Sequence, residues 1–396
     1  MLNFRKVIVQ INEVDKASIV ERAFREEILT NASQAYATAS SAPTAFSDRL
    51  EKSKPWVLWP VAIPLEPFGL TVAVNKNTEP VTVVATDGSQ IMPSHHEVFS
   101  CYLLNIGIAA FSYGVLLSPI LDTEPQLFHR PEDLYPLVDR RRIHIDELYV
   151  SLERNLKEME TLLRVALEML ERTLPVVALL DGSLIPWSVE KMSEGYQEKY
   201  RERMATVLEA FYKARIPLIG YLSHSRSSDL VNDLRIWKCP YTLSKCRELC
   251  GHLNEEDFPC SSIWPLADRQ LLGKEVQAGH RTSVFVSGAS VARSLPDIQR
   301  TCFVYLNVGA EIARLEFPAW LFDEKEILSK TMGTIIAQVE KGHGYPITLA
   351  EAHNLAVIRA HDRQQFFELL SRHLVSLGVH RVDVSPKESR KRQGII

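Results

Sequence analysis

The chain has 396 residues, and its hydrophobic fraction of 46% is enough for a large folded core. The formal net charge of −4 excludes a globally basic protein, so a polyanionic partner would have to meet a local basic patch. We expect a cytoplasmic protein without membrane contact: no signal peptide is visible, no apolar run approaches the roughly 20 residues that span a bilayer, and the 6 cysteines suit a reducing compartment.

The N-terminal region, residues 1–55, is predicted to be a helical extension with a loop or linker at 37–53, where Ala, Ser and Thr are frequent. Strand-like sequence follows up to residue 114. A long amphipathic helix is then predicted from Ile145 to Arg172, because leucine and methionine recur there at i+3 and i+4 spacing.

Strands alternate with helices in the rest of the chain, and this order favours an α/β fold with a mixed sheet flanked by helices. We expect three parts along the sequence. They are the helical extension 1–55, a large domain 56–380 with a cysteine-containing insertion near 237–262, and a basic, flexible tail 381–396.

The clearest chemical signal is a strand followed by Asp-Gly-Ser, which occurs twice. Val81–Ala85 leads to Asp87, and Val176–Leu180 leads to Asp181. Such apolar runs are typical of strands buried on both faces, and the glycine after each aspartate is expected to let the backbone turn sharply. Two carboxylates at neighbouring strand ends would face each other, and they would either repel or hold divalent cations.

A third carboxylate would complete a site for one or two Mg²⁺ or Mn²⁺ ions, which prefer oxygen ligands and can activate a water for phosphodiester hydrolysis. The predicted helix at 145–172 carries several glutamates. Helical geometry places Glu160 closest to the leucine stripe, whereas Glu158 points away from it. Glu160 is the predicted inward carboxylate, and the alternative is that it borders the apolar face with its carboxylate in water.

A histidine near the C-terminus also stands in a helical pattern. His353 follows Leu349 by four residues and precedes Val357 by four, so it is predicted on the buried side of a helix. It is either a hydrogen-bonded core residue, or a metal ligand or a group that orients the attacking water.

Several of these segments, in this order, resemble the NurA nucleases over about residues 80–365: "VVATDGSQ", a helix with an inward glutamate, "VVALLDGSL", "IPLIGYLSHSRSSDL", "ARLEFPAW" and "YPITLAEAHNLAVIRAHDR". The resemblance implies an RNase H-like core and a Mn²⁺-dependent (or Mg²⁺-dependent) single-strand endonuclease and 5′-to-3′ exonuclease. It also implies a homodimer that acts on single-stranded DNA and duplex ends in DNA end resection and repair, with a hexameric HerA-type DNA-translocating ATPase as its partner.

The resemblance also implies roles for individual residues. Asp87 and Asp181 match the two metal-binding aspartates of the family, and His353 matches the histidine of its C-terminal helix. Glu160 is the match to the helical glutamate, although the spacing leaves Glu158 open.

Substrate-binding residues are expected in two segments. The family has a basic residue next to a serine where this chain has Ser225 and Arg226, and a guanidinium can grip a phosphate at two points. Arg314 and Glu316 alternate on a predicted strand, so Arg314 is expected to face the DNA channel; the alternative is an ion pair at the sheet surface.

Four cysteines stand outside this pattern, and none of their spacings is Cys-x-x-Cys. They could bind Zn²⁺ or an iron–sulfur cluster, or be buried thiols of which two share a helix face. They are Cys239, Cys246, Cys250 and Cys260. For the whole chain two alternative functions stay open: a non-catalytic platform for the ATPase, and a metal-dependent phosphohydrolase of small nucleotides.

Overall fold

The computed structural model describes residues 2–93, 100–172, 175–291 and 295–378, so the expected basic tail 381–396 lies outside the described residues. The chain divides into two compact units, each discontinuous in sequence. The first comprises Met1–Asn75, Leu222–Arg293 and Arg300–Phe322, and the second comprises Lys76–Tyr221, Ser294–Gln299 and Asp323–Ile396. No helix in the described ranges is both long and apolar enough to cross a membrane.

The second unit is built on a mixed sheet in the order β5-β4-β3-β8-β9. β3, β4 and β5 are antiparallel neighbours, while β8 and β9 run parallel to β3. This is the arrangement expected of an RNase H-like fold, so the predicted fold class is confirmed. The strands are β3 (Val81–Ile91), β4 (Tyr102–Tyr113), β5 (Ile120–Phe128), β8 (Val176–Asp181) and β9 (Leu218–Leu222).

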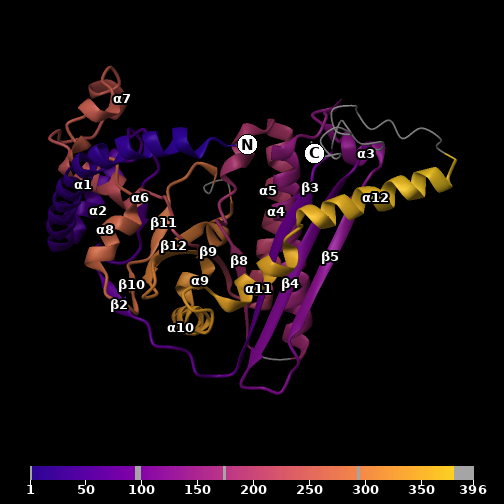
Figure 1. Ribbon diagram of the computed structural model, residues 1–396. Coiled ribbons are helices and arrows are strands. Elements are labelled where there is room, and N and C mark those ends of the chain that lie inside the picture. The colour runs from indigo at the N-terminus through magenta and orange to yellow at the C-terminus, as the bar shows by residue number, and fades with distance from the viewer. Residues whose placement is uncertain (1, 94–99, 173–174, 292–294, 379–396) are drawn as a thin grey trace. The chain divides into compact units, whose positions relative to one another are not determined.

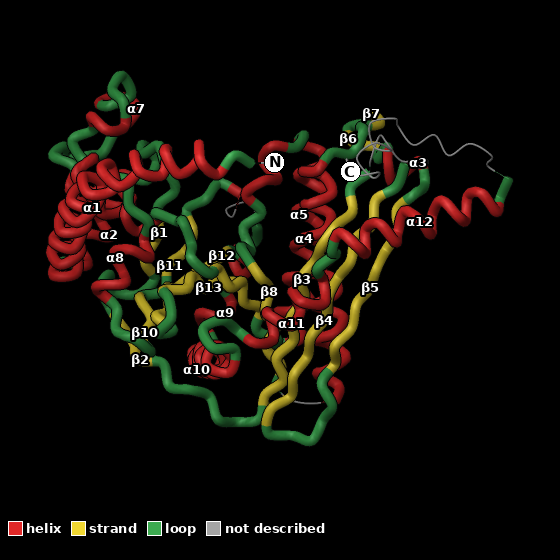
Figure 2. The backbone as a smooth tube through the Cα atoms, in the orientation of Figure 1, coloured by secondary structure: helices red, strands yellow, loops and turns green. Residues whose placement is uncertain are grey.

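Helices cover both faces of this sheet (Figures 1 and 2). α4 packs on β3 and β8 and is anchored where the Thr86 hydroxyl donates a hydrogen bond to the carbonyl of Glu158 at 3.0 Å. α11 packs on β3 and β4. The longer helices of this unit are α4 (Glu147–Arg172), α5 (Glu194–Ala214), α10 (Lys325–Lys341), α11 (Ile347–Ala356) and α12 (Ala360–Ser376). Its shorter elements are α3 (Pro131–Leu134), β6 (Leu137–Val138) and β7 (Arg141–Arg142).

The first unit combines a second set of strands with helices. β1, β11, β12 and β13 are successive antiparallel neighbours, and β10 pairs with both β12 and β2. The strands are β1 (Ala62–Pro64), β2 (Thr71–Ala73), β10 (His280–Thr282), β11 (Phe285–Ser287), β12 (Thr301–Asn307) and β13 (Ile312–Pro318). The helices are α1 (Phe4–Ser41), α2 (Pro43–Ser53), α6 (Asp229–Lys238), α7 (Cys246–Leu249), α8 (Asp268–Glu275) and α9 (Trp320–Asp323).

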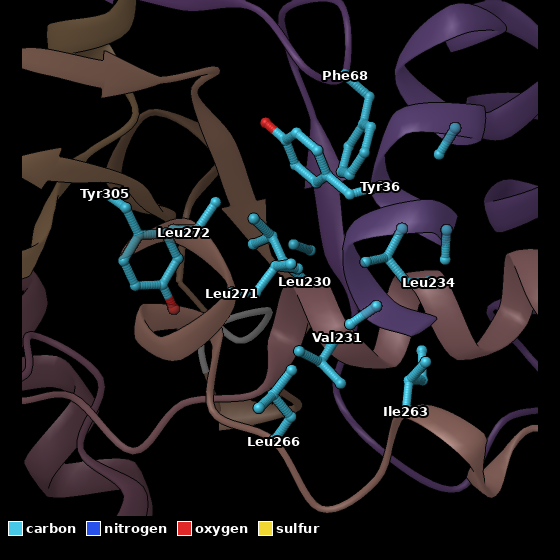
Figure 3. Close-up of a cluster of buried hydrophobic side chains, with 14 of the residues drawn as sticks. Tyr36, Phe68, Leu230, Val231, Leu234, Ile263, Leu266, Leu271, Leu272 and Tyr305 are labelled. Atoms are coloured by element: carbon cyan, nitrogen blue, oxygen red, sulfur yellow. The ribbon is translucent and has the colours of Figure 1, made fainter. Parts of the chain in front are cut away.

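The N-terminal helices contribute to the core of the first unit. Figure 3 shows leucines of α6 and α8 meeting Tyr36 of α1 and Phe68. The predicted loop at 37–53 is wrong: α1 continues to Ser41, and α2 begins at Pro43, which occupies the first turn. Pro is well suited to that position, and burial of Phe46 and Leu50 stabilises the helix that follows.

Candidate active site

Asp87 and Asp181 lie on adjacent parallel strands. Thr86 on β3 is in register with Leu180 on β8, so the next residue of each strand is an aspartate on the same face of the sheet. The pKa of Asp181 is raised by burial and by the charge of Asp87. The predicted pairing of the two carboxylates is therefore present in the structure.

The backbone takes a different course after each of the two aspartates. β8 ends at Asp181, and Gly182 turns with φ +107°, as predicted. β3 instead continues through Asp87 to Ile91, so the expected turn at Gly88 is wrong. The strand leaves the core at this point all the same, because residues 81–86 are buried and 87–90 are only partly buried.

Glu158 of α4 is the third carboxylate. Its side chain is only 8% exposed, and its Oε1 lies 3.1 Å from Nε of Arg154. Burial raises the pKa of Glu158 to about 8; Arg154 lowers it, and the charges of Asp87 and Asp181 raise it. With this pKa Glu158 is largely protonated near pH 7, and its ionised form, buried beside two aspartates, needs more positive charge than one guanidinium supplies.

The prediction that Glu160 points inward is wrong. Glu160 forms an ion pair with Arg203 of α5, whose Nη2 lies 2.8 Å from its Oε1. Not all leucines of this helix face inward: Leu167 is 38% exposed, and Leu163 is only partly buried. The buried face of α4 is rotated away from the stripe of leucines that the sequence suggested. Glu158 therefore lies on the buried face, and Glu160 does not.

Gly88 makes the inward position of Glu158 sterically feasible. A Cβ at this position would lie 2.4 Å from Oε1 of Glu158 and 2.9 Å from Cγ of Arg154. Glycine therefore leaves the space that the glutamate occupies next to the Asp87 backbone.

We expect Gly88→Ala to displace Glu158 and to destabilise the fold by about 1–3 kcal/mol, because the added methyl group overpacks the contact with α4. Urea unfolding would measure the change, with Gly273→Ala in α8 as control, since nothing lies within 4 Å of a Cβ there. Equal unfolding midpoints for the wild type and Gly88→Ala would contradict this description of the contact.

His353 extends from α11 toward Asp87. Its Nδ1 lies 2.7 Å from Oδ2 of Asp87, and its side chain is 60% exposed, so its predicted position on a buried helix face is wrong. α11 is fixed at its C-terminal end because Asn105 donates to the carbonyls of Leu355 and Ala356, at 3.2 and 2.9 Å. His353 therefore joins the aspartates from the face of the sheet that α11 covers.

Tyr345 was not identified from the sequence. It lies just before α11, and its hydrogen bond to the Asp181 carboxylate lowers the pKa of Asp181 against the effect of burial. Its ring meets that of Tyr221 edge-on, with centroids 5.4 Å apart. A tyrosine before a proline is an ordinary helix start, so the local sequence held no signal for this contact.

A cavity of about 320 Å³ opens beside the carboxylates. Arg154, Glu158 and Asp181 line it together with residues of the loop after β8. Trp187 of this loop is 43% exposed. The cavity is therefore lined by a cationic and an aromatic side chain together with two acidic ones, Glu158 and Asp181.

The chemistry of these residues fits a divalent cation, although the side chains as placed do not surround one. Among the described residues, no three His, Cys, Asp or Glu side chains are positioned as ligands of a single ion. Three carboxylates are nevertheless the donor type that Mg²⁺ and Mn²⁺ prefer, and Oε1 of Glu158 is buried without an aligned hydrogen bond. Ligation would require Glu158 to exchange its contact with Arg154 for the ion.

The raised pKa of Glu158 predicts a pH-dependent stability. Between about pH 5 and pH 8 folded Glu158 keeps a proton that the unfolded chain has lost, so this group makes the metal-free protein less stable as pH rises. We expect the Tm of metal-free Glu158→Gln to exceed that of the wild type by an increasing amount across this range. The Tm of both proteins would be measured in EDTA from pH 5 to pH 8.5. A difference between Glu158→Gln and the wild type that stays constant over this range would contradict the expected effect of Glu158.

The residues expected to bind substrate belong to the first unit. Ser225 is buried, and its hydroxyl lies 2.9 Å from that of Ser227, whereas Arg226 is exposed. Arg314 is 0% exposed: its Nε donates to Glu316 at 2.8 Å and its Nη1 to Asp229 at 2.7 Å. The expectation that Arg314 faces a DNA channel is therefore wrong, because its guanidinium is fully buried and is paired with two carboxylates.

Comparison with known proteins places these observations in a family. Residues 81–358 match the sequence model of the NurA domain. The NurA nuclease from Sulfolobus solfataricus is similar in structure, with a TM-score of 0.53 and 13% identity over 95% of this chain and 98% of that chain. No curated protein sequence matches the chain.

Two further solved structures are similar at lower scores. A NurA bound to dAMP and manganese has a TM-score of 0.37 at 12% identity, over 94% of this chain and 98% of that chain. The catalytic domain of human endonuclease V has a TM-score of 0.31 at 11% identity, over 76% of this chain and 92% of that chain.

Proposed function

This chain belongs to the NurA domain family, and from that membership and the geometry of its carboxylates we propose that it is a divalent-metal-dependent DNA nuclease. The observation that carries the proposal is the buried Glu158 beside Asp87 and Asp181: these are three oxygen ligands, and a bound divalent cation would stabilise the ionised form of Glu158 that burial disfavours. Mn²⁺ is the proposed ion, with Mg²⁺ as the alternative, because a related NurA was crystallised with manganese.

Asp87, Glu158 and Asp181 would hold the ion. When bound, such a cation activates a water and offsets charge on the phosphate in the transition state. Tyr345 keeps Asp181 in place and favours its ionised form by donating a hydrogen bond to it.

His353 has the geometry of a proton acceptor. An ionised Asp87 only accepts hydrogen bonds, so at their 2.7 Å contact the proton lies on Nδ1 of His353. The lone pair is then on Nε2, and the exposure of the side chain lets this atom reach a water. We propose that His353 orients the attacking water and accepts its proton.

Arg154 and Trp187 are the proposed substrate contacts of the cavity beside the carboxylates. Arg154 is next to Glu158, so a guanidinium released from that contact could bind a phosphate oxygen. Trp187 offers an exposed ring on which a base of a single strand could stack. The exposed Arg226, with Ser225, remains a proposed contact to the DNA backbone.

The finer assignment rests on the family resemblance of the sequence motifs. We propose single-strand endonuclease and 5′-to-3′ exonuclease activity in DNA end resection and repair, by a homodimer that works with a hexameric HerA-type ATPase.

The choice of substrate tests this proposal. We expect the purified chain with Mn²⁺ to cut circular single-stranded DNA, to release the label of 5′-labelled linear DNA on short products and to shorten 3′-labelled linear DNA, but not to hydrolyse free nucleotides. Hydrolysis of nucleotides alone would indicate a phosphohydrolase. No cutting, even with the ATPase added, together with no shift in Tm on adding Mn²⁺, would indicate a non-catalytic platform.

A further inference from the structure

The segment from Cys239 to Cys260 in the first unit has little regular structure. It contains one helical turn, Cys246–Leu249, and a short 3₁₀ turn at Glu255–Asp257. Its buried apolar cluster consists of Phe258, Cys250 and Cys260, with Trp59 and Leu249 packed against them. So small a core rarely holds a loop of this length, and segments of this kind commonly depend on a covalent or metal link.

The four thiols of the segment are brought together. Cys246, Cys250 and Cys260 are each 6% exposed, and Cys239 is partly buried. Cys250 lies one helical turn beyond Cys246, with its amide donating to the Cys246 carbonyl at 2.9 Å, so both side chains share a face. Cys250 and Cys260 belong to the same contact cluster.

The backbone around these cysteines is fixed independently of the thiols. Arg49 of α2 donates hydrogen bonds to the carbonyls of Cys239 and Tyr241. The amide of Ser261, next to Cys260, donates to the carbonyl of Phe258 at 2.9 Å. The cysteines therefore have defined positions at both ends of the segment.

A buried cation lies beside the thiols. Arg235 is 1% exposed, its Nη1 lies 2.8 Å from Oε1 of Glu255, and its guanidinium stacks 3.9 Å from the Trp59 ring centroid. Its positive charge also acts on the Cys260 thiol. A guanidinium in this position would stabilise a thiolate and would offset the negative charge of a metal centre with several thiolate ligands.

We propose that Cys239, Cys246, Cys250 and Cys260 together ligate a metal centre through their thiolates. Thiolates select zinc and iron–sulfur clusters, and four of them complete either centre. Because no three described ligands are placed around a single ion, the thiols must turn toward one another to bind either centre. The centre would hold the loop to α2 and α6.

The four sulfurs are near enough to interact, because Cys239, Cys250 and Cys260 each act on Cys246. Zinc and iron–sulfur centres bind cysteines as thiolates, so metal binding would release the protons of the thiols.

Metal analysis of the full chain, purified anaerobically without chelators, tests the proposal. We expect either about one zinc per chain or about four irons with equal sulfide and visible absorption. A thiol-specific mercurial should release the metal from the wild type. This measurement needs no variant that might fail to fold, and its readout is independent of nuclease activity.

Two kinds of variant locate the centre. Cys246→Ser and Cys260→Ser should lose the metal, whereas Cys302→Ser, a buried cysteine of β12, and Asp181→Asn should keep it. The proposal is overturned if the wild type holds neither zinc nor iron after reconstitution. It is also overturned if Asp181→Asn loses the metal while the cysteine variants keep it, since the ion would then belong to the carboxylates.

Discussion

Asp87→Asn and Asp181→Asn are each expected to lower the nuclease rate by about a thousandfold or more while leaving the fold intact. The reason is that each change removes a negative charge from a set of three carboxylates, and a neutral amide binds a divalent cation much more weakly. Both side chains are at the edge of the buried part of the sheet, so the substitution adds no cavity. The rate would be measured on single-stranded DNA with Mn²⁺, and the fold by circular dichroism.

The matched control for these two variants is Asp122→Asn. Asp122 is an exposed aspartate of β5 in the same sheet, and its carboxylate accepts the amide hydrogen bond of Thr123. Its substitution should leave the rate within about twofold. Near-normal cutting by both Asp87→Asn and Asp181→Asn would end the assignment of these residues as catalytic.

Glu158→Gln should abolish cutting, whereas Glu160→Gln should retain most of it. The two glutamates are two residues apart on α4 and differ mainly in direction: Glu158 faces Asp87 and Asp181, and Glu160 faces Arg203. Glutamine keeps the size of each side chain. Glu160→Gln weakens two partly exposed ion pairs, with Arg203 and with Lys157, so its stability should fall by about 1 kcal/mol or less.

Affinity for Mn²⁺, measured by calorimetry at pH 7.5, would accompany these rates. Binding should weaken strongly in Glu158→Gln and hardly change in Glu160→Gln, because only Glu158 is near the aspartates. The opposite order, with Glu160→Gln inactive and Glu158→Gln active, would contradict the placement of α4 on the sheet.

The aspartates were predictable from sequence because their signal is local. A run of apolar residues buried on both faces, followed by Asp-Gly-Ser, predicts the strand and places the aspartate where the strand leaves the core, although β3 itself continues to Ile91. Two such runs in one α/β fold are expected at the same edge of a sheet, and the register of Thr86 with Leu180 realises this. The fold class was predictable because strands alternate with helices along most of the chain.

The helical carboxylate was not predictable in the same way. Choosing between Glu158 and Glu160 depends on the exact rotation of α4, and leucines that remain partly exposed shift the apparent stripe. Its packing is decided by contacts distant in sequence, such as Gly88 and the hydroxyl of Thr86. The hydrogen bond of Tyr345 to Asp181 and the exposure of His353 also depend on how α11 packs on the sheet, so the sequence did not predict them.

Arg314 shows how a strand pattern can mislead. Alternation of polar and apolar residues is typical of a half-exposed strand, yet every residue of β13 is buried. The charges are tolerated because Arg314 is paired with Glu316 on its own strand and with Asp229 of α6. Asp229 is distant in sequence and meets Arg314 only in the folded unit. The sequence of the strand alone therefore could not show that Arg314 is buried.

The most direct measurement is cleavage of end-labelled single-stranded DNA by the purified wild-type chain in Mn²⁺, Mg²⁺ or EDTA. We expect cutting with Mn²⁺ and none in EDTA, and the rate with Mn²⁺ should rise between about pH 6 and pH 8, where the ion more easily displaces the proton of Glu158 into solvent. Equal cutting with and without EDTA, or no cutting with any divalent ion, would contradict this expectation.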